Sequence, residues 1–96
     1  MLSAVNGVTS RVRTGAQALL AANWREGMGR DGARFGYTCP DGAKYPYQWF
    51  WDSLLHALAW NEVDPARAAT ELRSLAAAQR ADGLIGHTVF WEQPVR

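Results

Sequence analysis

The 96-residue sequence has a single cysteine, Cys39, so no internal disulfide can form. A lone cysteine is typical of a protein from a reducing compartment, and we therefore expect a cytoplasmic protein. The sequence also has no apolar run that approaches the roughly 20 residues needed to cross a bilayer. We expect no membrane partner.

An excess of charge of one sign is also lacking. Ten Lys and Arg residues against nine Asp and Glu residues leave a formal net charge of +1, and the basic residues are scattered. Nucleic-acid-binding domains concentrate basic side chains on one face, so we expect no nucleic-acid partner. The possible metal ligands Cys39, His56 and His87 have spacings that match no metal motif, so we predict no metal and no cofactor.

The most informative segment that is present reads YPYQWFWDSLLH, over Tyr45–His56. Its five aromatic rings surround one carboxylate, that of Asp52. Aromatic faces stack well on the C–H-rich face of a sugar ring, and a carboxylate accepts hydrogen bonds from sugar hydroxyls. Large rings also fill protein cores, so the same segment is compatible with plain packing.

Ahead of this segment the sequence predicts one helix and a long loop. Apolar residues recur at three- and four-residue steps over Val8–Trp24, which predicts an amphipathic helix. Five glycines and two prolines lie within Gly27–Tyr47, which disfavours a helix there. Inside that loop, Arg34–Thr38 could form a short strand or an extended stretch, and Asp41-Gly42 indicates a turn.

Two further helices are expected after the loop. The segment Gln48–Asn61 is apolar nearly all round, as interior helices are. Asp64 and Pro65 suit the cap and first position of a third helix, which Ala81-Asp82-Gly83 would stop. We expect its polar, outward side to carry Arg67, Glu71, Arg73 and Arg80. The pair forms an αα-hairpin, and we expect an all-α fold.

The stretches YPYQWFWDSLLHALAW and ELRSLAAAQRADGLIGHTVFW resemble the N-terminal region of glycoside hydrolase family 63, in its bacterial mannosylglycerate and glucosylglycerate hydrolase branch. The upstream LLAANWREG and FGYTCPDGAKYPY fit the same branch, so the resemblance covers Ala18–Trp91. It implies an (α/α)6 toroid, of which residues 1–96 would be an incomplete N-terminal segment with a leading helix, a long loop and one αα-hairpin. It also implies hydrolysis of small α-glycosides of glycerate with inversion.

The same resemblance assigns roles to residues. Those that correspond to the lining of the sugar pocket are Tyr45, Trp49, Trp51 and Asp52. His87 corresponds to a position near the glycerate end, and Gln48 to one that supports the loop. The catalytic Asp and Glu of the family lie beyond the position of Arg96, so we predict no catalytic residue in this chain.

The two tryptophans of the pocket constrain its geometry. A step of two residues turns a helix by about 200°, so Trp49 and Trp51 would point in nearly opposite directions on one helix. If both contact sugar, one of them must lie at the helix start or in the loop before it.

The sequence leaves two alternatives open. One is another enzyme of the same toroid class, such as a trehalase-like or oligosaccharide-trimming glucosidase, which would need more rings and neutral donors at the second subsite. The other is a helical module that binds a protein partner through its aromatic face, since exposed apolar patches mark such surfaces. The oligomeric state is not indicated by the sequence.

Overall fold

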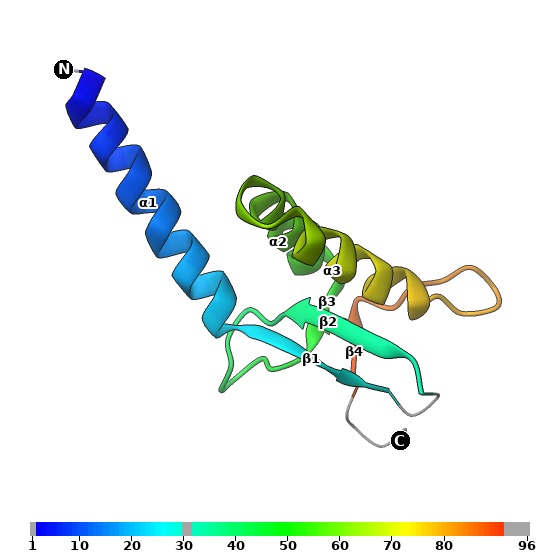
Figure 1. The fold of residues 1–96 in the computed structure, drawn as a ribbon. Helices are drawn as coiled ribbons and strands as arrows, with labels where there is room; N and C mark the ends of the chain where they lie inside the picture. Colours follow the sequence, from blue (N-terminus) through cyan, green and yellow to red (C-terminus); the bar gives the residue numbers. More distant parts are fainter. Residues whose placement is uncertain (1, 30–31, 92–96) are drawn as a thin grey trace.

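The computed structural model describes residues 2–29 and 32–91 of the chain. Its elements are, in order, α1 (Leu2–Ala22), β1 (Trp24–Met28), β2 (Arg34–Thr38), β3 (Gln48–Trp49), α2 (Phe50–Val63), α3 (Pro65–Ala77) and β4 (Thr88–Val89). Figure 1 shows α2 and α3 lying over the β1–β2 hairpin, while α1 extends away from this body. The molecule is accordingly long, with extents of 55 × 26 × 20 Å.

The expected all-α fold class is wrong. The described part of the chain contains two small antiparallel sheets, β1–β2 and β3–β4, beside its three helices. In the first sheet Trp24–Met28 pairs with Arg34–Thr38, whereas the predicted leading helix ended at Trp24 and the predicted loop began at Gly27. The structure therefore gives no support to the toroid that the family resemblance implied.

The β1–β2 hairpin confirms the extended stretch predicted at Arg34–Thr38. Its register runs from Trp24 opposite Thr38 to Met28 opposite Arg34. At the turn, the Gly29 N–H donates to the Ala33 carbonyl at 2.7 Å, and Gly32 has a φ of 81°. That left-handed backbone is readily adopted only by glycine.

The α2–α3 hairpin is confirmed, with shifted bounds. Asp64 caps α3, since its Oδ1 accepts from the Arg67 N–H at 3.3 Å, and Pro65 is the first helical residue as predicted. However, α3 ends at Ala77, earlier than the predicted stop, and Gly83 lies in the next turn with a φ of 92°. Helix α2 begins two residues later than expected because Gln48 and Trp49 belong to β3.

Two small apolar clusters form the core. One contains Phe35, Tyr37 and Cys39, with the ring of Trp91 stacked on Phe35 at 5.2 Å between centroids. The other joins Ala57, Trp60 and Ala68 and receives Leu20, Trp24 and Val63 at its edge. The guanidinium of Arg67 lies 5.2 Å and 4.9 Å from the ring centroids of Trp24 and Trp60, a distance at which a cation is attracted to an aromatic face.

Glu71 joins the helical hairpin to the strand hairpin. Its side chain is fully buried, and its Oε1 accepts from both the backbone N–H and the hydroxyl of Thr38, at 3.0 and 2.6 Å. The Thr38 hydroxyl in turn accepts from the Trp60 indole N–H at 2.7 Å. The expectation that Glu71 faces outward is therefore wrong: a carboxyl group of α3 satisfies polar groups of β2 that would otherwise be buried without partners.

The second contact of α3 with β2 depends on a glycine. The Gly36 N–H donates to the Ser74 hydroxyl at 2.8 Å. A Cβ at position 36 would lie only 2.6 Å from the Trp24 ring and 2.7 Å from the Thr70 methyl. The absence of a side chain at Gly36 thus allows the helix and the strand to approach this closely.

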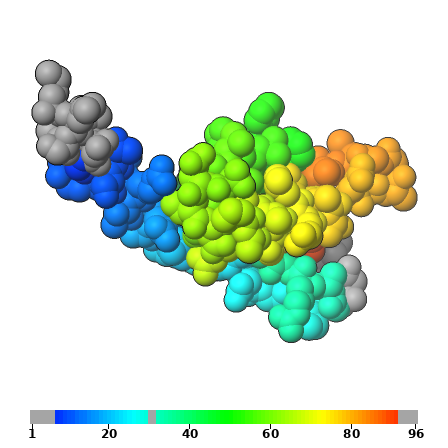
Figure 2. Space-filling view, turned by 45° about the horizontal axis from the view of Figure 1, so that its top comes forward, coloured from blue at the N-terminus to red at the C-terminus, as the bar shows by residue number. Residues whose placement is uncertain are grey.

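Helix α2, which the sequence predicted to be apolar nearly all round, is not enclosed on all sides within this chain. It buries Ser53, Ala57 and Trp60. Its other side exposes Trp51, Leu55 and Leu58, of which Trp51 is 72% exposed. Figure 2 shows α2 and α3 forming one broad face, with α1 projecting to the side. Among the described residues, the helices are too short or too polar to cross a membrane.

Replacing Gly36 with Ala is expected to lower the free energy of unfolding by about 1–3 kcal/mol, because the added methyl overpacks a site bounded by an indole ring and a methyl group. Urea unfolding followed by far-UV circular dichroism measures this. The matched control is Gly7→Ala in α1, where the new Cβ would meet only the Arg11 side chain, at 3.7 Å. Equal effects of the two substitutions would contradict the close approach described at Gly36.

Glu71→Ala is expected to destabilise the chain by about 3 kcal/mol, because it strands the N–H and hydroxyl of Thr38 in the interior. Glu71→Gln keeps an acceptor oxygen and should cost about 1 kcal/mol. Arg73→Ala, an exposed change on the same helix, should stay within about 0.5 kcal/mol of the parent. If Ala and Gln at position 71 are equally destabilising, the hydrogen bonds to Thr38 are not the source of the effect.

Candidate functional site

The five residues predicted to contact sugar lie at the junction of the loop, β3, α2 and β4. In the β3–β4 pair, Gln48 lies opposite Val89 and Trp49 opposite Thr88. The ladder continues into the helix start, since the Phe50 N–H donates to the His87 carbonyl at 2.9 Å. This pairing brings His87 beside Trp49 although the two are distant in sequence.

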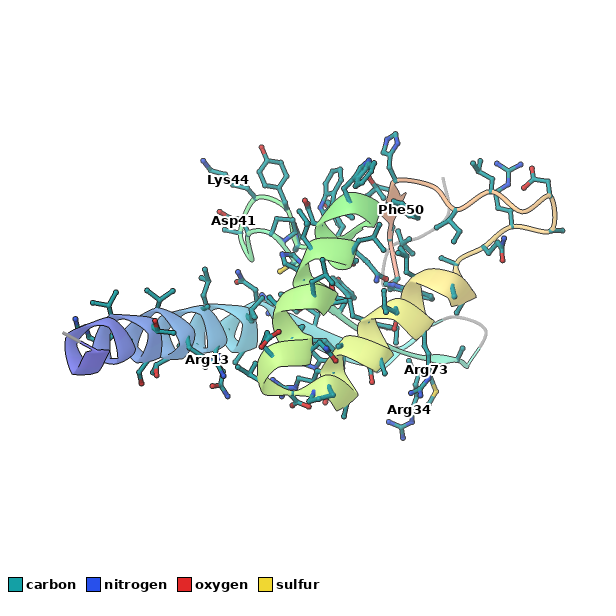
Figure 3. The ribbon with its side chains drawn as sticks, turned by 90° about the horizontal axis from the view of Figure 1, so that it is seen from above. Arg13, Arg34, Asp41, Lys44, Phe50 and Arg73 are labelled. Carbon is teal, nitrogen blue, oxygen red and sulfur yellow. The ribbon has the colours of Figure 1, made fainter. Side chains whose placement is uncertain are left out.

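An aromatic cluster, which consists of Tyr45, Tyr47, Trp49 and Phe90, occupies this junction. The Trp49 ring meets Tyr45 edge-on, with centroids 6.0 Å apart and planes at 80°, and lies 6.4 Å from Tyr47. Tyr47 meets Phe90 edge-on at 4.7 Å. Figure 3 shows aromatic side chains gathered at this edge of the molecule, between Lys44 and Phe50.

Tyr45 is presented by a tight turn. The Asp41 Oδ1 accepts from the backbone N–H groups of Ala43 and Lys44 at 2.8 and 2.9 Å, and the Asp41 carbonyl accepts from the Tyr45 N–H. The backbone hydrogen bonds from Lys44 and then Ala43 hold the pKa of the Asp41 carboxyl below its ordinary value. The turn predicted at Asp41-Gly42 is confirmed and leaves the Tyr45 side chain exposed.

The side chain of Gln48 fixes β3 to the interior of the molecule through hydrogen bonds. Its side chain is buried, and its Nε2 donates to the Ser53 hydroxyl at 3.0 Å and to the Glu71 carbonyl at 3.2 Å. Its Oε1 accepts from the Trp91 indole N–H at 2.7 Å. Because both the nitrogen and the oxygen of this side-chain amide are hydrogen-bonded, β3 is fixed, and the adjacent Trp49 has a defined position.

Two polar groups at the junction have no partner within the described part of the chain. The Asp52 carboxyl lies half-buried in the first turn of α2 and makes no hydrogen bond or ion pair there. The Trp49 indole N–H is shielded from solvent and also has no hydrogen-bond partner among the described residues. Of the two, the Asp52 carboxyl is accessible, and an open acceptor beside aromatic rings suits a ligand that carries hydroxyl groups.

The structure unites some of the predicted residues and separates others. Tyr45 and Trp49 are in ring contact, and Trp49 lies in β3 before the helix, as simultaneous contact of both tryptophans with sugar requires. The Trp51 ring instead meets Phe50 edge-on at 6.2 Å and is exposed, as is His87. Ligand contact by these five residues remains a prediction.

Sequence reasoning missed Glu71 as a support of this junction. Its unbonded Oε2 lies 3.5 Å from the Nδ1 of His56 in α2. A signal was present, since Glu71 is spaced three residues after Ala68 and four before Leu75, both buried in α3. A lone acid at that spacing among small and apolar residues belongs to the inward face of a helix.

Other features of the described residues do not form the site. A pocket of about 350 Å³ is lined by Glu26, Gly27, Arg34, Phe35 and Thr70, none of which belongs to the junction. No group of His, Cys, Asp and Glu side chains within residues 2–29 and 32–91 could hold a metal ion. Burial raises the pKa of the Cys39 thiol, which donates to the Asn23 carbonyl and so remains a packed, protonated group.

The comparisons with known proteins agree with the resemblance seen in the sequence. The chain is 47% identical over 62 residues to a mannosylglycerate hydrolase of Thermus thermophilus. The alignment covers 64% of this chain and 15% of that protein. It is 49% identical over 55 residues to the mannosylglycerate hydrolase MGH1 of Selaginella moellendorffii, with 57% and 11% covered. A glucosylglycerate hydrolase of Mycolicibacterium hassiacum is 39% identical over 46 residues, with 48% and 10% covered.

The chain therefore spans only a small part of the length of these relatives. No solved structure matches it significantly. The family model described as the mannosylglycerate hydrolase MGH1-like glycoside hydrolase domain matches residues 45–95, which include the whole junction. Because that match covers more than half of the chain, the chain belongs to the MGH1-like glycoside hydrolase domain family.

Proposed function

We propose that this chain is a segment of an α-glycosidase that acts on mannosylglycerate- or glucosylglycerate-type glycosides, and that it supplies part of the sugar-binding pocket. The observation that carries the proposal is the overlap of the family match with the junction of rings and unpaired polar groups around Trp49. Relatives named for mannosylglycerate and glucosylglycerate hydrolysis favour a glycerate glycoside over a disaccharide of the trehalase type.

The proposed pocket binds sugar by stacking and by hydrogen bonds. The nearly perpendicular rings of Tyr45 and Trp49 form two walls against which the C–H face and the edge of a pyranose can pack. The Asp52 carboxylate, half-buried in the first turn of α2, accepts hydrogen bonds from sugar hydroxyls. Trp51, which is exposed in the same helical turn as Asp52, covers the open edge of the bound sugar.

His87 is proposed to face the glycerate end of the substrate. Its backbone is fixed beside the start of α2 by the hydrogen bond from Phe50, while its side chain remains exposed. An imidazole N–H, neutral or protonated, is a suitable donor to the carboxylate of a glycerate group.

The catalytic acid and base are proposed to come from sequence outside residues 1–96. Inverting hydrolysis needs two carboxyl groups roughly 6.5–9.5 Å apart on opposite sides of the scissile bond. The matched relatives carry most of their length outside the region that this chain spans. The role left for Asp52 is to hold the sugar, and it takes no part in proton transfer.

The purified 96-residue chain is expected to hydrolyse neither mannosylglycerate nor glucosylglycerate, because the proposed acid and base are absent from it. The measurement is release of free sugar against a blank without protein. Turnover that is clearly above the blank and lost in Asp52→Ala would place the catalytic pair within this chain and sink that part of the proposal.

Asp52→Asn is best tested in a chimera, in which residues 45–91 replace the matching segment of the Thermus thermophilus mannosylglycerate hydrolase. Losing the charge of a hydrogen-bonded carboxylate costs roughly 1.5–3 kcal/mol, so kcat/KM should fall by about one to two orders of magnitude. The melting temperature should stay close to that of the unsubstituted chimera.

The matched control in that chimera is Asp82→Asn, which makes the same chemical change in an exposed loop. The ion pair of Asp82 with Arg80 is solvent-exposed, so its loss should leave kcat/KM unchanged. A lowered melting temperature with normal kinetics for Asp52→Asn would make Asp52 a structural acid and remove it from the pocket.

A further inference from the structure

One polar contact inside the α2–α3 hairpin has no role in the sugar pocket. The Nδ1 of His56 in α2 lies 3.5 Å from the Oε2 of Glu71 in α3. Both atoms are shielded from solvent, and neither has a hydrogen-bond partner among the described residues. Their separation is at the outer limit of a hydrogen bond, so each can serve as the partner of the other.

The contact does not depend on sequence outside this chain. The side chain of Glu71 is 0% exposed and that of His56 is 21% exposed. The two facing atoms are already covered by residues of the chain itself. Additional protein could cover the remaining edge of the imidazole, but it would not uncover Nδ1 or Oε2. The chemistry of the pair is therefore decided within this chain.

The two atoms need one hydrogen between them. A neutral imidazole has one N–H and one nitrogen with a lone pair, and a carboxylate is an acceptor only. If Nδ1 carried the lone pair, two acceptors would face each other away from water. Each unsatisfied acceptor raises the free energy of the folded state. A hydrogen between Nδ1 and Oε2 removes both of these costs.

The hydrogen belongs to the imidazole and not to the carboxyl group. The Oε1 of Glu71 already accepts from the backbone N–H and the hydroxyl of Thr38, at 3.0 and 2.6 Å. Hydrogen bonds donated to a carboxyl group favour its ionised form. A carboxyl group is also ordinarily a stronger acid than an imidazolium. Nδ1 of His56 is therefore the donor, and Oε2 of Glu71 is the acceptor.

The other ionisable groups near the pair do not replace this donor. Beyond the end of β2, the Cys39 thiol donates to the Asn23 carbonyl at 3.3 Å. In α3, the guanidinium of Arg67 lies over two tryptophan rings of the core. In α2, Asp52 precedes His56 by one turn and is itself an acceptor when ionised. Strand β3 contains no charged residue.

We propose that Glu71 fixes His56 in the Nδ1–H form, and that the two residues join α2 to α3 through this hydrogen. The neutral ring then offers Nε2 as a hydrogen-bond acceptor. A hydroxyl or an N–H group can donate to Nε2, whereas a carboxylate cannot. His56 therefore differs in chemistry from His87, to which a donor role toward the glycerate carboxylate is given above.

The experiment is a long-range ¹H–¹⁵N correlation spectrum of the imidazole rings in the ¹⁵N-labelled 96-residue chain, at about pH 8.5, where histidine side chains are ordinarily neutral. The chain has two histidines, and His87→Gln assigns their signals. His56 should show a protonated Nδ1 and an unprotonated Nε2. The exposed His87 should show the mixture typical of free histidine, in which the Nε2–H form predominates. An Nε2–H form at His56, or the same mixture at both histidines, overturns the proposal.

Glu71→Gln tests the cause. The amide can turn its oxygen to the donors of Thr38, and its NH₂ group then donates to His56. His56 should therefore change to the Nε2–H form, while His87 is unchanged. The matched control is Thr38→Val, which removes a donor to the other oxygen of Glu71 and should leave His56 in the Nδ1–H form. An Nδ1–H ring in folded Glu71→Gln would show that Glu71 does not set the tautomer, and rejects the proposal.

Urea unfolding decides the case even if Glu71→Gln does not fold. His56→Asn keeps an N–H donor near the position of Nδ1, whereas His56→Leu has a similar size and no donor. The Asn variant should unfold at a higher urea concentration, because the Leu variant leaves the Oε2 of Glu71 buried without a partner. This order is the reverse of helix propensity, in which Leu is favoured over Asn. A Leu variant that is as stable as the Asn variant, or more stable, contradicts the proposal.

Discussion

One buried residue of α3, Glu71, is hydrogen-bonded to both small sheets. The side chain of Glu71 accepts two hydrogen bonds from Thr38 in β2, and its backbone carbonyl accepts a third from Gln48 in β3. A carboxyl group without partners would be costly in an interior, and the N–H and hydroxyl of Thr38 would also be costly to bury without an acceptor. Each therefore makes the burial of the other possible. The Glu71 side chain joins α3 to β2, and its backbone carbonyl joins α3 to β3.

The geometry of the candidate site depends on the packing of α3 against β2 and β3. Because β2 is fixed against α3, the Tyr37 hydroxyl can donate to the Pro46 carbonyl at 2.7 Å and hold the chain immediately before Tyr47. Because Gln48 is fixed from three directions, Trp49 enters the aromatic cluster at a defined angle. None of the residues that make these hydrogen bonds is proposed to contact sugar, yet the positions of those that do depend on them.

The sequence predicted what local chemistry decides. Pro65 after the capping Asp64, the extended Arg34–Thr38 and the α2–α3 hairpin have signals within a few residues of each other, and the motif around Trp49 indicated the family.

The predicted fold class was wrong because β1, β3 and β4 have no such local signal. Two of them are only two residues long, and Trp24–Met28 is a strand because a partner strand lies beside it. The burial of Glu71 was not predicted because a charged residue was assigned to the polar side of the helix, although its spacing from Ala68 and Leu75 places it on the buried side. The assignment of five residues to the sugar pocket rests on the family resemblance, because no local pattern in the sequence specifies contact with a sugar. These residues are Tyr45, Trp49, Trp51, Asp52 and His87.

The hydrogen bond between Trp91 and Gln48 spans 43 residues and has a consequence for biosynthesis. Until residue 91 has been made, the buried amide of Gln48 lacks one of its hydrogen-bond partners, and the Phe35 ring lacks the Trp91 ring that stacks on it. At a synthesis rate of about 5–20 residues per second, the interval between the two residues lasts roughly 2–9 s. For that time β3 is without its partner strand and the Phe35 ring is without Trp91, so the junction is the last part of this segment that can be completed during synthesis.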